Sequence, residues 1–139
     1  MRRTRILLVD DNRVNRKLLA AVLEADGHRI DEAGSGREAV EGCRLLPYDL
    51  VLMDIQMADM DGLAAATEIR ALGGRQGEVP IVAISGDVEG DIVERCLAAG
   101  MNGHLPKPVS PTILTEAVTR WSRSRAPAPA DRAAGPVAA

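Results

Sequence analysis

The chain has 139 residues, of which 46% are hydrophobic and 27% are charged, and its formal net charge is −3. This length and composition are typical of one globular domain with its own core, and the small negative charge argues against nonspecific nucleic-acid binding. No apolar run reaches membrane-spanning length and no signal-peptide pattern follows the basic start, so we expect a cytoplasmic protein without membrane or nucleic-acid partners.

The first half of the chain predicts three strands and two helices. In chain order these are a strand over residues 5–9, a helix over 12–25, a strand over 28–33, a helix over 36–46 and a strand over 49–53. Gly27 is expected to end the first helix, and Ser35 with Glu38 forms a capping box for the second. By helical spacing, the apolar face of the first helix is expected to contain Val14, Leu18, Val22 and Ala25.

The second half continues the alternation of strands and helices. It predicts a helix capped by Asp61 that ends before Gly73, a strand over 79–85 entered through Pro80, a helix capped by Asp87 and ended by Gly100, a strand over 103–105, and a helix over 111–121 capped by Ser110. The alternation implies one parallel α/β domain over residues 1–121. Residues 122–139 are rich in Ala and Pro and have almost nothing to bury, so we expect a disordered tail or a linker there.

Charged residues stand at the ends of three of the apolar runs. Asp10 and Asp11 follow the first predicted strand, Asp54 follows the third, and Lys107 lies just past the fifth, directly before Pro108. Open parallel sheets bind ligands outside the carboxyl ends of their strands, so these side chains are expected to meet at one site. Three carboxylates and one ammonium suit a divalent metal ion together with a phosphoryl group. The alternative for the adjacent pair is that one aspartate caps the first helix and the other is an idle charge.

The choice of basic residues gives Lys107 additional weight. Only two of the seventeen basic residues are lysines, Lys17 and Lys107, so this chain uses arginine wherever a generic positive charge suffices. A compact ammonium at a strand end therefore indicates a need that a planar guanidinium does not meet. The two cysteines, Cys43 and Cys96, lie in helical patterns without a CxxC motif, and we expect reduced thiols that behave as small apolar residues.

Five short motifs, taken together, resemble the receiver domain of two-component response regulators over roughly residues 5–121. They are Ile-Leu-Leu-Val-Asp-Asp-Asn, Leu-Val-Leu-Met-Asp-Ile-Gln-Met, Met-Asp-Gly, Ala-Ile-Ser-Gly and Leu-Pro-Lys-Pro-Val, in the order and spacing of that family. The stretch Asp-Asp-Asn-Arg-Val-Asn-Arg resembles receivers of hybrid histidine kinases and phosphorelays more than those of transcription factors. The resemblance implies a doubly wound (βα)5, flavodoxin-like fold with a five-stranded parallel sheet of order 2-1-3-4-5.

The resemblance also implies roles for the acidic residues. Asp54 would be the phosphoacceptor, because a carboxylate can attack phosphorus to form an acyl phosphate. Mg2+ prefers oxygen ligands and takes few protein carboxylates. By resemblance, Asp11 and Asp54 would bind it directly, the backbone carbonyl of Gln56 would supply a third oxygen, and Asp10 would act through water.

Further roles and partners follow from the same resemblance. Lys107 would pair with a phosphoryl oxygen and stabilise the transition state of transfer, and Pro108 offers a cis bond that the family typically has. The Ser85 hydroxyl would donate a hydrogen bond to a phosphoryl oxygen, with Gly86 leaving room for the backbone to approach. A histidine kinase or a histidine phosphotransfer protein would donate the phosphoryl group, and an output protein that remains unknown would respond.

Three positions depart from the usual pattern of the family. Ala58 stands where proline is usual, Ser85 where threonine is commoner, and His104 where a tyrosine or phenylalanine ring acts as a rotamer switch. We therefore expect intact phosphorylation chemistry and an altered mode of output. Two interpretations of His104 stay open: it is the switch residue, or it is a fixed, half-exposed strand residue and output uses the face of the last two helices.

Other classes of function fit the sequence less well. A pseudo-receiver, which is a pure interaction module, would have lost acidic positions or the lysine, and none is lost. A phosphatase of the haloacid dehalogenase type needs Asp-x-Asp after the first strand, whereas the candidate nucleophile here follows the third and residue 56 is glutamine. No helix-turn-helix pattern follows residue 121, so DNA-binding control of transcription is not supported. We expect a phosphoacceptor switch more than a turnover enzyme.

Overall fold

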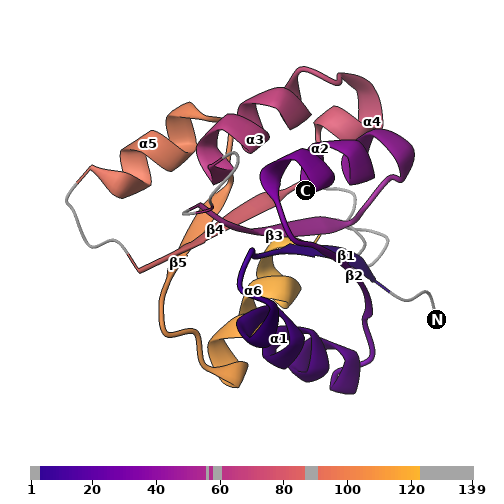
Figure 1. Cartoon of the computed structure of the whole chain (residues 1–139), viewed down its shortest axis with the longest axis vertical. Coiled ribbons are helices and arrows are strands. Elements are labelled where there is room, and N and C mark those ends of the chain that lie inside the picture. The colour runs from indigo at the N-terminus through magenta and orange to yellow at the C-terminus, as the bar shows by residue number, and fades with distance from the viewer. Residues whose placement is uncertain (1–3, 56, 58–60, 87–90, 123–139) are drawn as a thin grey trace, which may run out of the picture.

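The computed structural model describes residues 4–55, 57, 61–86 and 91–122. Five parallel strands form one sheet of order β2-β1-β3-β4-β5, with helices on both faces (Figure 1). The strands are β1 (Arg5–Val9), β2 (Arg29–Ala33), β3 (Leu50–Asp54), β4 (Ile81–Ser85) and β5 (Gly103–Pro106). The helices are α1 (Arg13–Ala25), α2 (Gly36–Leu45), α3 (Gly62–Arg70), α4 (Gly74–Gly77), α5 (Ile92–Ala98) and α6 (Pro111–Trp121). The predicted architecture and strand order are confirmed.

The core lies in two layers, one on each face of the sheet. Side chains alternate between the faces of a strand, so Leu7 and Val9 of β1 pack with residues of α2, α3 and α5, whereas Ile6 and Leu8 pack with residues of α1 and α6. Strands β3 and β4 are buried along their whole length, which explains their continuous apolar runs. Both cysteines are buried thiols that form no disulfide, as predicted. Among the described helices, none combines the length and the apolar character needed to cross a membrane.

The prediction for the apolar face of α1 is wrong for three of its four residues. Val14 and Leu18 are 71% and 62% exposed, and Ala25 is also exposed, while the side chains that face the core are those of Leu19, Ala20, Val22 and Leu23. Two neighbouring stripes of this helix are apolar, and helical spacing alone does not show which of them packs on the sheet. An apolar stripe beginning at the first turn of α1 is therefore left at the surface.

The helix caps agree with the predictions at most ends. Ser110 and Asp61 accept hydrogen bonds from Ile113 N at 3.1 Å and Ala64 N at 2.8 Å. The capping box of α2 forms only in part: Ser35 accepts from Glu38 N, but the Glu38 carboxylate accepts from Gly34 N and not from Ser35 N. Its carboxylate thereby ties the turn before the helix to the first turn of α2.

Several boundaries differ from the predicted ones. Strands β2, β3 and β4 begin one or two residues later than expected, and β3 includes Asp54. The short helix α4 differs from the prediction, which ends the preceding helix before Gly73 and has no further helix before β4. Gly73 and Gly74 both have positive φ, and the chain turns directly into α4. The predicted cap Asp87 lies outside the described residues, and α5 is described from Ile92, with Asp91 at its N-cap position.

Arg70 at the end of α3 holds together the segments that lead into β4 and β5. Its guanidinium donates hydrogen bonds to the carbonyls of Gly77, Val79 and Gly100, at 2.7–2.9 Å, and to Asn102 Oδ1 at 3.0 Å. Burial lowers the pKa of Arg70 from its ordinary value, but the group remains a cation at any working pH. Four acceptors from two segments thus bind one side chain.

We expect Arg70→Ala to lower the free energy of unfolding by about 2–4 kcal/mol, because partly buried carbonyls lose their partner. Urea unfolding measures this change. Arg37→Ala is the matched control, since Arg37 is exposed on α2, and surface substitutions usually stay within about 0.5 kcal/mol. Equal midpoints for the two variants would contradict the role of Arg70.

Candidate functional site

The carboxyl ends of β1 and β3 bring three carboxylates together. Asp10 and Asp11 follow β1, Asp54 is the last residue of β3, and the two strands pair in parallel, with Val9 beside Met53. Each carboxylate offers one oxygen, and these three oxygens lie within 4.8 Å of one another. Asp10 and Asp54 are each only 3% exposed, whereas Asp11 is exposed. The predicted meeting of the three aspartates is confirmed.

Lys107 reaches this cluster from the end of β5. Its Nζ lies 3.4 Å from Oδ2 of Asp54, and its backbone N–H donates to Ser85 O at 2.9 Å. The Lys107–Pro108 bond is cis, as the resemblance implied. The lysine side chain is one third exposed, so its ammonium group remains accessible from the cavity beside it.

Asp10 has a different surrounding from Asp11. Asp10 Oδ1 accepts a hydrogen bond from Asn12 N at 2.9 Å, and Asp10 Oδ2 accepts one from Asn15 Nδ2 at 2.5 Å. Neither aspartate caps α1; the Asn12 side chain does so by accepting from Asn15 N at 2.9 Å. The alternative that one aspartate of the pair is a helix cap is therefore wrong. Both oxygens of Asp10 face protein donors, which leaves Asp11 as the more accessible carboxylate of the pair.

Sequence reasoning missed Asn15 as a site residue. Asn15 lies in the first turn of α1, its side-chain amide donates to Asp10 Oδ2, and the residue lines the cavity described below. The available signal was its place in the motif that begins at Asp10, five residues earlier, where a helix must start immediately after the strand end. Polar side chains in that first turn are candidates for contact with the carboxylates, and the rotation of the helix decides which of them makes it.

An open cavity of about 680 Å3 lies over the cluster. It is lined by Asp10, Asp11, Asn12, Asn15, Leu19, Asp54, Ile84, Lys107, Pro108 and Val109. Three carboxylates against one ammonium leave the site short of positive charge, and like charges this close repel. Oxygen donors from two buried carboxylates and one exposed carboxylate suit a hard divalent cation such as Mg2+, which keeps several waters that the open cavity can hold. The residues present therefore fit this metal.

The remaining predicted site residues are Ser85, Gln56 and His104. Ser85 is completely buried at the end of β4, where the preceding Ile84 pairs with Asp54, and it is not among the residues that line the cavity. Gln56 lies outside the described residues, as does Ala58. His104 lies on β5 beside Ala83, away from the carboxylates.

Gly62 allows helix α3 to start against the end of β3. A Cβ atom at this position would lie 2.7 Å from both the Asp54 carbonyl oxygen and Ile55 Cα, and its N–H donates to Ile55 O at 3.1 Å. Only glycine permits this approach. This accounts for a glycine directly after the cap Asp61 and links the start of α3 to the backbone of Asp54.

The sequence of this chain is similar to that of a known family and to those of several known proteins. Residues 6–119 match the family model described as the response regulator receiver domain. The histidine-protein kinase BarA of Escherichia coli (strain K12) is 38% identical over 116 residues, which cover 84% of this chain, and the sensor protein GacS of Pseudomonas syringae pv. syringae is 37% identical over 132 residues, which cover 92%. The matched regions span only 12% and 15% of the lengths of those two kinases.

Solved structures of receiver domains share the fold. The receiver domain of the sensor histidine kinase PA1611 from Pseudomonas aeruginosa PAO1, crystallised with a magnesium ion in its active-site cleft, is 38% identical with a TM-score of 0.79, over 86% of this chain and 98% of that one. A complex of the Saccharomyces cerevisiae phosphotransfer protein Ypd1 with the receiver domain of Ssk1 gives 28% identity and a TM-score of 0.82, over 93% of this chain and 95% of that one. With the family model matching most of its length, this chain belongs to the response regulator receiver domain family.

Proposed function

We propose that this chain accepts a phosphoryl group on Asp54 in a Mg2+-dependent reaction of a phosphorelay, and that residues 1–121 form the receiver unit that carries this switch. The observation that carries the proposal is the buried Asp54 carboxylate, which faces an open cavity together with a second and a third carboxylate and the Lys107 ammonium. A nucleophile, a cation site and a fixed positive charge are the parts that phosphoryl transfer needs.

The chain's own residues have distinct parts in this reaction. An Asp54 oxygen forms a bond to phosphorus as the phosphorus–nitrogen bond of a phosphohistidine donor breaks, and the electron pair of that bond returns to the imidazole. Asp11 and Asp54 would hold Mg2+ directly, the backbone carbonyl of Gln56 would be a third ligand, and Asp10 would act through water. When bound, the ion neutralises charge on the phosphoryl oxygens. Lys107 would balance another phosphoryl oxygen, and Ser85 would donate to the phosphorylated form.

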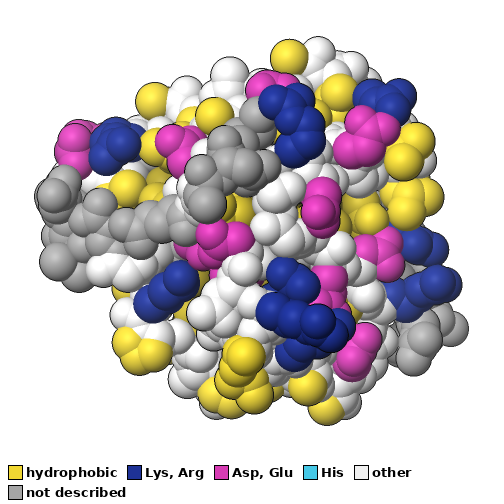
Figure 2. All heavy atoms as spheres, in the orientation of Figure 1, with side chains coloured by type: hydrophobic (Ala, Val, Ile, Leu, Met, Phe, Trp, Pro, Cys, Tyr) yellow, Lys and Arg dark blue, Asp and Glu magenta, His cyan; other side chains and the backbone are white. Residues whose placement is uncertain are grey.

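Helix α1 is our candidate docking surface for a phosphotransfer donor. The exposed Val14 and Leu18 form an apolar stripe on the helix whose Asn15 and Leu19 line the cavity. Lys and Arg side chains gather over α1 (Figure 2), and Arg13 and Lys17 are exposed there. A phosphohistidine must come within bonding distance of Asp54, so its protein has to contact this rim of the cavity. The Ypd1–Ssk1 complex gives a precedent for a phosphotransfer protein bound to a receiver domain.

Labelling with acetyl phosphate tests the proposed function. We expect one phosphoryl group per chain by intact mass when Mg2+ is present, and none when the metal is removed with EDTA. A pseudo-receiver would stay unlabelled in both conditions. Labelling that is unaffected by metal removal would contradict the metal dependence.

Lys107→Arg tests whether the site needs a compact ammonium. The Lys107 Nζ is already within 3.4 Å of Asp54, and the broader, longer guanidinium cannot occupy that place with the same geometry. We expect slower phosphorylation, by about ten-fold or more if the transition-state contact is lost, with an unchanged unfolding midpoint. The rate of labelling by acetyl phosphate measures this effect, and a rate equal to that of the wild type would show that any cation suffices.

His104 is proposed as the residue that transmits the switch. Its Nε2 is buried and has no hydrogen-bond partner within the described part of the chain, and the residue lines a cavity of about 340 Å3 with Ile113 and Trp121 of α6. Such a nitrogen gains from any rearrangement that supplies a partner. We expect the imidazole NMR signals to move when beryllofluoride, a phosphoryl mimic, is added. Unchanged His104 signals beside clear shifts at Ser85 would contradict the switch role.

A further inference from the structure

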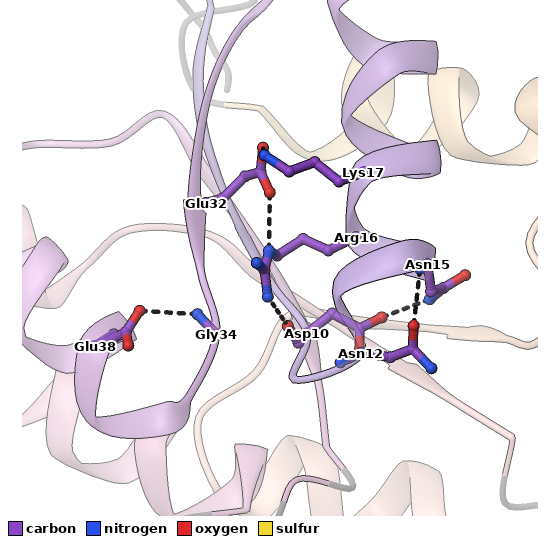
Figure 3. A network of polar contacts seen from close by, with 8 residues as sticks. All are labelled: Asp10, Asn12, Asn15, Arg16, Lys17, Glu32, Gly34 and Glu38. Carbon is purple, nitrogen blue, oxygen red and sulfur yellow. Dashed lines mark hydrogen bonds and ion pairs between the residues drawn. The ribbon is translucent and has the colours of Figure 1, made fainter.

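Arg16 links the acidic pair to the neighbouring strand. Its Nη1 donates to the backbone carbonyl of Asp10 at 2.7 Å, and its Nε donates to Glu32 Oε1 at 2.8 Å (Figure 3). The Arg16 side chain is only 16% exposed. Glu32 lies on β2 and pairs with Leu8 of β1. One guanidinium therefore spans the end of β1, the first turn of α1 and strand β2.

The guanidinium also lies close to the turn that follows β2. A Cβ atom at Gly34 would lie 3.2 Å from Arg16 Nη1, so the group packs closely over the turn after β2. That turn is itself tied down, because Glu38 accepts from Gly34 N at 2.9 Å. The hydrogen bond from Arg16 is the largest cause that lowers the pKa of the Glu32 carboxyl. The pair therefore stays ionised at neutral pH and is lost only as the pH falls through that lowered pKa.

We infer that Arg16 is a positioning residue that holds the backbone at Asp10, and with it the Asp10–Asp11 carboxylates, in the arrangement that binds Mg2+. The two carboxylates belong to the first residues after β1, where the chain turns into α1. The Asp10 carbonyl accepts from Arg16, and the Asp10 N–H donates to Ala33 O of β2 at 3.1 Å. Arg16 acts through the backbone and does not touch the metal or the phosphoryl group. This inference rests on the proposed function.

A purely electrostatic role for Arg16 predicts the opposite result. Arg16 is a cation near a cation site, so its removal should strengthen Mg2+ binding if charge were all that mattered. If Arg16 holds the turn, its removal should weaken binding instead. The sign of the change therefore separates the two roles.

Magnesium titration by calorimetry on Arg16→Ala, Arg16→Lys and Lys17→Ala tests the inference. Lys17 is the matched control, since its Nζ lies 3.0 Å from Glu32 Oε2 but it is 56% exposed and does not reach Asp10. We expect Arg16→Ala to weaken Mg2+ binding roughly three- to ten-fold, at the lower edge of what outer-shell partners contribute. Arg16→Lys should weaken it similarly although the charge is kept, because one ammonium cannot span both acceptors. Lys17→Ala should stay within about two-fold.

A second substitution at Glu32 distinguishes positioning from charge. Glu32→Gln should weaken Mg2+ binding in the wild-type background and have no further effect in Arg16→Ala, since residues that act through one another are not additive. Unfolding midpoints without metal show that each variant is folded at the titration temperature. Unchanged or tighter binding in both Arg16 variants would overturn the inference, and so would an equal loss in Lys17→Ala.

The failure of this inference differs from the failure of the proposed function. If the wild type binds Mg2+ and is labelled by acetyl phosphate while the Arg16 variants bind the metal equally well, only the positioning role is overturned. If the wild type neither binds Mg2+ nor is labelled, the proposed function itself is overturned, and the positioning role falls with it.

Discussion

Replacing Asp54 by asparagine should abolish phosphorylation while the domain remains folded. Asparagine has nearly the same shape as aspartate, but its amide is not a nucleophile toward phosphorus. The substitution also removes one of three carboxylates whose oxygens lie within 4.8 Å of one another, so it relieves repulsion, and the unfolding midpoint should be equal or higher. The Lys107 ammonium loses its partner at 3.4 Å, but it is one third exposed and can turn to water. Intact mass after incubation with acetyl phosphate and Mg2+ measures the loss.

Asp61→Asn is the matched control for this experiment. Asp61 lies shortly after Asp54 in the sequence and caps α3 by accepting a hydrogen bond from Ala64 N. Asparagine is an equally good N-cap. Its carboxylate is not part of the acidic cluster. We expect wild-type labelling of Asp61→Asn and none of Asp54→Asn. Full labelling of Asp54→Asn would show that another residue is the acceptor.

The sequence predicted the acidic cluster because its geometry depends on topology alone. Any parallel sheet places the carboxyl ends of neighbouring strands at one edge, so residues directly after β1 and β3 must meet. Lys107 follows from the same rule at β5. The packing role of Gly62 in the Met-Asp-Gly motif could not be predicted, because its close approach to the Asp54 carbonyl oxygen depends on where α3 packs. Strand ends are thus readable from hydrophobic pattern, whereas helix placement is not.

Contacts that depend on how α1 packs could not be predicted. The face containing Val14 and Leu18 satisfied the helical period, but the stripe containing Ala20 and Leu23 is the one in the core. The contacts of Arg16 could not be predicted for the same reason, since its partners are the Asp10 backbone carbonyl and Glu32 of β2. Both errors have one cause: periodicity gives the repeat of a helix and not its rotation about the axis.

The two aspartates after β1 should differ in their effects on metal binding. Asp11 is exposed and lines the cavity. In the proposed function Asp11→Ala would remove a direct oxygen ligand and its charge. Asp10 is engaged by Asn12 N and Asn15 Nδ2, so Asp10→Asn should act as a change behind the metal ligands. We expect Mg2+ affinity to fall by about a hundred-fold or more for Asp11→Ala and by about ten-fold for Asp10→Asn, since outer-shell partners contribute about 10–100-fold.

Calorimetric titration with Mg2+ decides the order of these two effects. Lys17→Ala again serves as the reference for a change of charge on the nearby helix α1. The unfolding midpoint without metal reports any loss of stability caused by removing the Asp10 hydrogen bonds. Wild-type affinity in Asp11→Ala would contradict its role as a ligand. A larger loss in Asp10→Asn than in Asp11→Ala, with both variants folded, would exchange the two roles. The buried carboxylate would then bind the metal in place of its hydrogen bonds to Asn12 and Asn15, and the exposed one would act from behind it.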